Sequence, residues 1–170
     1  MLLPTGIVSL VTALTTAIGL LAGPPDQLRP TEPATGWTWP LLPQPAVVHE
    51  FGPPQHRWEP GHRGVDLAAA VGQPVVAPAP GVVTFSGPLA GRGVVVITHP
   101  NGLRSTFEPV GGALAVGEAV EPREVIGHLA DTPTHCAPAV CLHWGVLRGR
   151  VYLDPLGLIG RPQIVLLPLG

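Results

Sequence analysis

Short apolar runs separated by Gly, Pro or Asn make up the chain from about Ala46 onward. The runs are rich in Val, Ile or Thr, which is typical of β-strands. The expected strands cover residues 46–51, 74–79, 81–86, 93–98, 103–107, 124–129 and 141–147. No helical stripe separates them, and a strand about every ten residues predicts an all-β fold, a compact antiparallel sandwich or barrel-like sheet. Residues 164–169 could add an edge strand.

The N-terminus has a different pattern, because residues 6–22 contain no charged side chain. This length lies between that of a secretory apolar region and that of a minimal membrane span. We expect residues 1–22 to form an apolar helix, either a signal peptide or a membrane anchor. No Lys or Arg precedes the run and no clear cleavage site follows it, so both alternatives stay open. A buried core helix would need a partner domain.

Residues 23–45 are rich in proline and include Gly-Trp-Thr-Trp-Pro at 36–40. This composition predicts an extended linker, with the folded domain over residues 46–170. Overall the chain is 45% apolar and 12% charged, which allows a core and argues against disorder. The net charge of −2 gives no electrostatic case for binding nucleic acid, so no nucleic-acid partner is expected.

Cys136 and Cys141 are separated by Ala-Pro-Ala-Val and could close a short loop as a disulfide. Disulfides persist in oxidising compartments, so this pairing would fit an exported protein. Half of a metal site is the alternative, but the sequence has no second cysteine pair. We therefore expect the disulfide.

Candidate chemistry lies in two segments, Gly61-His62-Arg63-Gly64-Val65-Asp66 and Cys141-Leu142-His143-Trp144. Strand alternation places Cys141 and His143 on one face and Trp144 on the other, facing the core. Two imidazoles and a carboxylate form a three-ligand set with a fourth position for water, the ligand count of a catalytic zinc site. The spacing alone is equally compatible with packed or surface histidines.

At these residues the sequence resembles the lysostaphin-type, or LytM-domain, zinc metallopeptidases over about residues 46–158. His62 to Leu67 is similar to the family's His-x-Gly-x-Asp segment, and Cys141 to Trp144 resembles its closing His-x-His motif. The run Gly72 to Val83 resembles the segment that follows the first motif, and Val116 to Gly127 is similar to a paired-glycine strand turn.

The resemblance implies a LytM-like fold, also described as a duplicated hybrid motif, with a metal in a groove. It implies that His62, Asp66 and His143 bind Zn²⁺. Active members cut the cross-link peptides of bacterial peptidoglycan, so the expected partner is a peptidoglycan peptide and the expected location is the cell envelope. We expect a monomer that contacts a membrane only through its N-terminal segment.

The sequence departs from the family pattern at both assisting histidines. Cys141 replaces the first His of His-x-His, and Pro109 replaces the His that ends a Tyr-x-His strand. A positioned general base contributes about 10²- to 10⁴-fold in rate, and an oxyanion donor a comparable factor. Three interpretations therefore stay open: a peptidase with altered catalytic groups, a degenerate wall-binding domain, and a domain with structural zinc.

Candidate substitutes for the missing histidines are Glu108, His135 and, less favoured, His128, although for each of them a solvated surface residue is the favoured interpretation. Counted from Pro109, alternation points Glu108 to the opposite face unless a bulge intervenes. Cys141 could instead be a thiolate ligand that closes the metal site. Trp37 and Trp39 could stack on glycan or dock on the domain.

Overall fold

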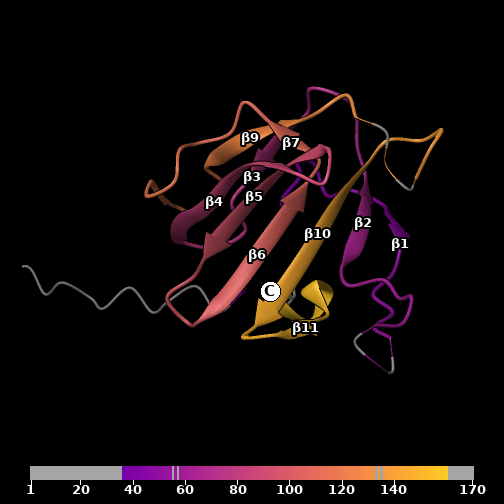
Figure 1. Cartoon of the computed structure of the whole chain (residues 1–170). Coiled ribbons are helices and arrows are strands. Elements are labelled where there is room, and N and C mark those ends of the chain that lie inside the picture. The colour runs from indigo at the N-terminus through magenta and orange to yellow at the C-terminus, as the bar shows by residue number, and fades with distance from the viewer. Residues whose placement is uncertain (1–35, 55, 57, 133, 135, 161–170) are drawn as a thin grey trace, which may run out of the picture. The chain divides into compact units, whose positions relative to one another are not determined.

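A computed structural model describes residues 36–54, 56, 58–132, 134 and 136–160 (Figure 1). All of them belong to one unit of the chain, Pro33–Gly170. The expected N-terminal helix, residues 23–35 of the linker, His135 and the strand expected at 164–169 lie outside the described residues. Within the described part of the chain, no helix has the length and apolar character needed to cross a membrane.

The regular secondary structure of the described residues is almost entirely β, as the spacing of apolar runs predicts, and every strand pair is antiparallel. The strands are β1 (Val47–His49), β2 (Val65–Ala68), β3 (Pro74–Val76), β4 (Gly81–Leu89), β5 (Arg92–Thr98), β6 (Leu103–Glu108), β7 (Val110–Gly111), β8 (Ala119–Val120), β9 (Val125–Leu129), β10 (Cys141–Arg148) and β11 (Val151–Leu153). A short 3₁₀ turn, η1 (Pro155–Leu158), follows β11.

The strands form two sheets. The larger one has the order β1-β2-β10-β6-β5-β4-β8, with β11 paired to β10, and the smaller one has the order β3-β9-β7. In Figure 1 the long strand β10 crosses the middle of the larger sheet, with β6 on one side and β2 on the other. Segments distant in sequence therefore become neighbours on β10.

Alternation along these strands separates a core face from an open face. On the larger sheet the fully buried side chains include Leu67, Phe107 and Trp144. They share a core cluster with residues of the smaller sheet such as Val75 and Ile126. Burying these side chains contributes roughly 1.5–3 kcal/mol each. Residues that alternate with these along the strands point to the open face. Asp66, next to Leu67, and His143, next to Trp144, are among them and carry the polar chemistry.

Residues 36–41 pack on the domain, which differs from the tether expected from their composition, whereas residues 42–44 are exposed. Leu41 is completely buried and Trp37 is 9% exposed, and both belong to the core cluster. The Trp37 amide donates to Leu158 O and the Thr38 amide to Pro78 O. Of the two alternatives for the tryptophans, Trp37 therefore docks on the domain. Proline-rich sequence made the segment look like a linker, but it covers apolar surface.

Candidate metal centre

Four polar side chains form a row across the open face of the larger sheet. His49 of β1 is opposite Asp66 of β2, and Asp66 is opposite His143 of β10. His143 is in turn opposite Glu108 of β6. Directly opposed residues of antiparallel strands project from the same face, with Cβ atoms about 4.5–5.5 Å apart. The register thus places two imidazoles and two carboxylates next to one another.

His62 joins this row from the loop before β2. Its backbone is held by two hydrogen bonds to Gly52, at 2.8 and 3.0 Å. Gly64, which follows closely, packs so tightly that a Cβ there would contact the Trp144 carbonyl and lie 2.8 Å from His143 Nε2. The glycine is needed for this close approach of the loop to β10.

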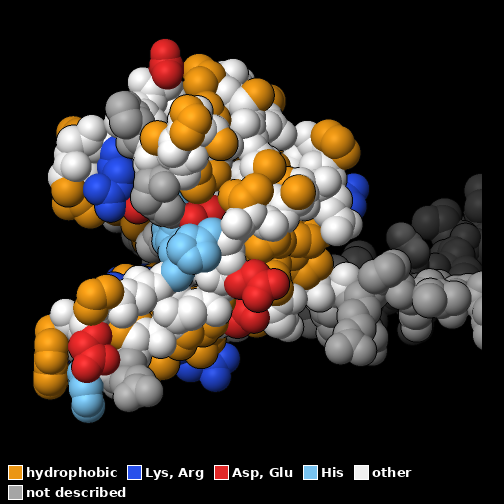
Figure 2. Space-filling view, turned by 90° about the vertical axis from the view of Figure 1, so that its right-hand side faces the viewer, with side chains coloured by type: hydrophobic (Ala, Val, Ile, Leu, Met, Phe, Trp, Pro, Cys, Tyr) orange, Lys and Arg blue, Asp and Glu red, His pale blue; other side chains and the backbone are white. Residues whose placement is uncertain are grey.

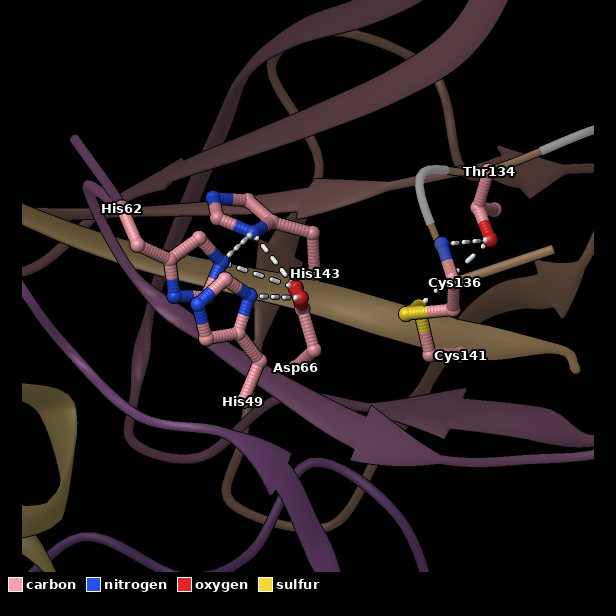
Figure 3. The surroundings of a disulfide bond; sticks show 7 residues. All are labelled: His49, His62, Asp66, Thr134, Cys136, Cys141 and His143. Atoms are coloured by element: carbon pink, nitrogen blue, oxygen red, sulfur yellow. Dashed lines mark hydrogen bonds and ion pairs between the residues drawn. A yellow bond between two sulfur atoms is a disulfide. The ribbon is translucent and has the colours of Figure 1, made fainter. Parts of the chain in front are cut away.

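The donor atoms of His62, Asp66 and His143 converge on one point (Figure 3). His143 Nδ1 lies 2.8 Å from Asp66 Oδ1, and His62 Nε2 lies 3.1 Å from both of these atoms. With metal–ligand bonds of about 2.0–2.1 Å, tetrahedral zinc ligands are separated by roughly 3.4 Å. The three atoms are close to that spacing, so a small outward movement would accommodate the ion.

The environment of these side chains also suits a cation. Asp66 is completely buried, and burying a carboxylate is unfavourable without a compensating charge. His62 Nδ1 lies 2.7 Å from the Glu50 carbonyl, so Nδ1 carries the proton and donates. Nε2 is then the lone-pair nitrogen and faces the other two donors. A second hydrogen bond of this kind typically orients metal-binding imidazoles. The residues present therefore fit a zinc ion.

Glu108 lies on the same face of the sheet as the cluster of His62, Asp66 and His143, so the expectation that it points away is wrong. Strand β6 ends at Glu108, and Pro109 is not part of the ladder from which alternation can be counted. The Glu108 carboxylate accepts a hydrogen bond from Arg92 at 2.9 Å. That bond is the main cause that raises the pKa of Arg92, against a smaller lowering by burial.

Cys141 forms a disulfide with Cys136, as expected. Because the sulfur is bonded, position 141 offers no thiolate to a metal, which removes the closed site with a Cys ligand. The two sulfurs lie within 4.8 Å of an Asp66 carboxylate oxygen (Figure 3). The position of one assisting histidine of the family is therefore occupied by a disulfide beside the ligand cluster.

The other predicted residues separate into three cases. Trp144 is fully buried in the core, as alternation predicts. His128 lies on β9 of the smaller sheet and does not line the groove described below. His135 lies outside the described residues, so its role stays a prediction. Sequence reasoning missed His49, whose position beside Asp66 depends on the pairing of β1 with β2.

An open groove of about 970 Å³ runs along this face of the sheet. Histidine side chains gather in a hollow of the surface in Figure 2. His49, His62 and His143 line the groove together with the Arg92–Glu108 pair. Apolar side chains from β4 and β5 line it as well: Phe85, Leu89, Val94 and Val96. The groove thus combines the ligand cluster, a charged pair and an apolar wall.

The chain matches the model of Peptidase family M23 over residues 60–155. It is 50% identical over 136 residues to the uncharacterized protein Rv2891 of Mycobacterium tuberculosis, covering 78% of this chain and 55% of that protein. It thus spans about half the length of this relative. It is also 37% identical over 91 residues to the DD-carboxypeptidase/endopeptidase Mpg of Neisseria gonorrhoeae, covering 53% of this chain and 21% of Mpg.

Solved structures agree in fold. The catalytic domain of lysostaphin from Staphylococcus simulans superposes with a TM-score of 0.57 at 21% identity, over 66% of this chain and 90% of that domain. A zinc-containing peptidase from Vibrio cholerae gives a TM-score of 0.60 at 22% identity, over 71% of this chain and 39% of that one. The match to the family model covers more than half of the chain and includes His62, Asp66 and His143, so this chain belongs to Peptidase family M23.

Proposed function

We propose that the domain is a zinc-dependent endopeptidase that acts on cross-link peptides of peptidoglycan in the bacterial cell envelope. The observation that carries the proposal is the convergence of His62 Nε2, Asp66 Oδ1 and His143 Nδ1, within 2.8–3.1 Å of one another, in an open groove. The family membership and the Neisseria relative, named as an endopeptidase, support the reaction class.

His62, Asp66 and His143 would hold the ion. When bound, zinc supplies Lewis-acid chemistry, activating water and polarising a peptide carbonyl. The Glu50 carbonyl fixes the proton of His62 on Nδ1 and keeps Nε2 as a donor of electrons. The buried charge of Asp66 favours a cation between the two imidazoles.

Glu108 is the group that we propose for proton transfer. It lines the groove next to His143 in the ladder, and its carboxylate can accept a proton from water and deliver it to a leaving amine. Arg92 orients this carboxylate through the hydrogen bond at 2.9 Å. The pair would replace the proton-transfer function of the histidines absent at positions 109 and 141.

The groove suits an extended peptide. Its apolar wall of Phe85, Leu89, Val94 and Val96 offers contact for small aliphatic side chains. The Arg92 guanidinium is 41% exposed and can also bind a carboxylate of the peptide. The Cys136–Cys141 disulfide supports an oxidising location outside the cytoplasm, where wall peptides are found.

A degenerate wall-binding domain is the second candidate, favoured by one specific observation. The disulfide at Cys141 and the proline at 109 remove both family histidines while the presumed ligands are all kept. Such a domain would hold zinc and bind wall peptide without cutting it. The same groove would serve as its binding surface.

Release of soluble muropeptides from purified peptidoglycan tests the proposal. The protein loaded with one equivalent of zinc should release cross-link fragments that mass spectrometry identifies, and His62→Ala should release none. Cosedimentation with the same peptidoglycan separates the two candidates. Binding without release from walls of several cross-link types would contradict the endopeptidase and favour the binding domain.

A further inference from the structure

His49 lies at the open side of the cluster formed by His62, Asp66 and His143, although it belongs to none of the sequence motifs. The ring is parallel to that of His62, with an interplanar angle of 5° and a centroid distance of 4.0 Å. Its side chain is 60% exposed, whereas that of Asp66 is completely buried. His49 therefore faces both the groove and the cluster (Figure 3).

The distance from His49 to Asp66 is that of neighbouring metal ligands. His49 Nδ1 lies 3.4 Å from Asp66 Oδ2, longer than the usual N–H···O hydrogen bond of about 2.7–3.2 Å. Ligand atoms around tetrahedral zinc are separated by roughly 3.4 Å. One donor atom each from His49, His62 and Asp66 lies within 4.8 Å of the other two. His49 thus approaches Asp66 Oδ2, while His62 and His143 converge on Oδ1 of the same carboxylate.

The local backbone explains why the ring reaches the cluster. The pairing of β1 with β2 is irregular between Val47 and His49. Such bulges redirect a side chain on an edge strand. β1 is three residues long and forms the edge of the larger sheet. An edge strand this short can shift with little loss of packing.

We propose that His49 is a fourth protein ligand of the metal, which makes the resting site a three-histidine, one-aspartate zinc centre. This inference rests on the proposal that His62, Asp66 and His143 bind zinc. Because the ring is exposed and on an edge strand, it is an exchangeable ligand that gives way when a peptide enters the groove. The site is then closed at rest and opens on substrate binding.

Metal binding by the full chain tests this without any assay of peptide cleavage. Zinc affinity is measured by competition with a chelator, and the coordination of bound Co²⁺ by its visible absorption. His49→Ala and His49→Gln are compared with the wild type, and His128→Ala is the matched control because His128 is exposed on β9. Circular dichroism confirms that each variant is folded.

Loss of an outer-sphere partner lowers metal affinity about 10- to 100-fold. Loss of a direct ligand should exceed this range and weaken or shift the tetrahedral Co²⁺ absorption in both His49 variants, with no change in His128→Ala. An unchanged Co²⁺ spectrum in both variants would overturn the inference, whatever the change in affinity. If the wild type bound neither zinc nor Co²⁺, the metal site itself would be wrong, and the proposed function would fail with it.

Discussion

Glu108 of β6 lies opposite His143 of β10, so a carboxylate and a proposed zinc ligand are neighbours on the same face of the sheet. His143 also contacts Asp66 on its other side, at 2.8 Å. The metal-ligand cluster and the Arg92–Glu108 pair thus share one row of the sheet. Substrate bound in the groove would contact both.

Replacing Glu108 with Gln removes the proposed proton acceptor but keeps the side-chain shape. Muropeptide release should fall by about 10²- to 10⁴-fold, because a positioned general base contributes that much. Zinc content should stay at the wild-type level, since Glu108 is not in the ligand cluster. Glu121→Gln is the control, because Glu121 is exposed outside the groove. Equal rates for Glu108→Gln and the wild type would exclude Glu108 from proton transfer.

Gly64→Ala should disturb the metal centre without replacing any of the proposed ligands. The new Cβ would contact the Trp144 carbonyl and lie 2.8 Å from His143 Nε2. Overpacking of this kind costs about 1–3 kcal/mol and would displace the imidazole. We expect lower stability in urea and at least about tenfold weaker zinc binding. Gly87→Ala, where a Cβ meets open space, should change neither quantity. Normal zinc binding by Gly64→Ala would contradict the tight packing.

His99 makes folding stability depend on pH. It is 3% exposed, with Nδ1 2.8 Å from the Pro80 carbonyl and Nε2 2.8 Å from Ser105 Oγ. Burial lowers the pKa of His99 below its ordinary value of 6.5, although the hydrogen bond to Pro80 partly opposes this. The unfolded chain therefore takes up the proton first as the pH falls. The contribution of neutral His99 to the free energy of unfolding is complete above pH 6.5 and is lost as the pH falls below that value.

Urea unfolding of metal-free protein checks this dependence. Between pH 7.5 and pH 5, the free energy of unfolding should fall more for the wild type than for His99→Gln. The comparison cancels the other histidines, which titrate in both proteins. Parallel pH dependences of the two proteins would show that His99 is not responsible.

Trp37→Ala should destabilise the domain, because Trp37 belongs to the core cluster and its ring lies 4.4 Å from that of His99. Core Trp→Ala changes cost about 3–5 kcal/mol. Trp58→Ala should stay within about 0.5 kcal/mol of the wild type, since Trp58 is 82% exposed. Thermal unfolding measures both. A loss of stability in Trp37→Ala as small as that in Trp58→Ala would mean that the packing of Trp37 does not stabilise the fold.

The sequence predicted the strands and the fold class well, because short runs of Val and Ile between glycines and prolines have few alternatives. The alternation in β10 correctly separated His143 from Trp144. Composition was misleading for residues 36–45, where prolines suggested a tether but Leu41 and Trp37 are core residues.

The lateral arrangement of the site could not be predicted in the same way. Whether His49 and Glu108 lie beside the His62–Asp66–His143 cluster depends on which residues of different strands are opposite each other. Alternation within one strand does not contain that register. The bulge in β1 and the end of β6 at Glu108 decide it. His62, Asp66 and His143 can be proposed as ligands from the sequence only because their motifs resemble those of a known family.

The zinc content of the purified protein tests the central claim most directly. Wild-type protein and the control His128→Ala, dialysed against the same zinc buffer, should each retain about one ion per chain, and His143→Ala should retain much less. Removing His143 takes away one of the three converging donors, the nitrogen 2.8 Å from Asp66 Oδ1. Wild-type zinc content in His143→Ala would contradict the proposed metal centre.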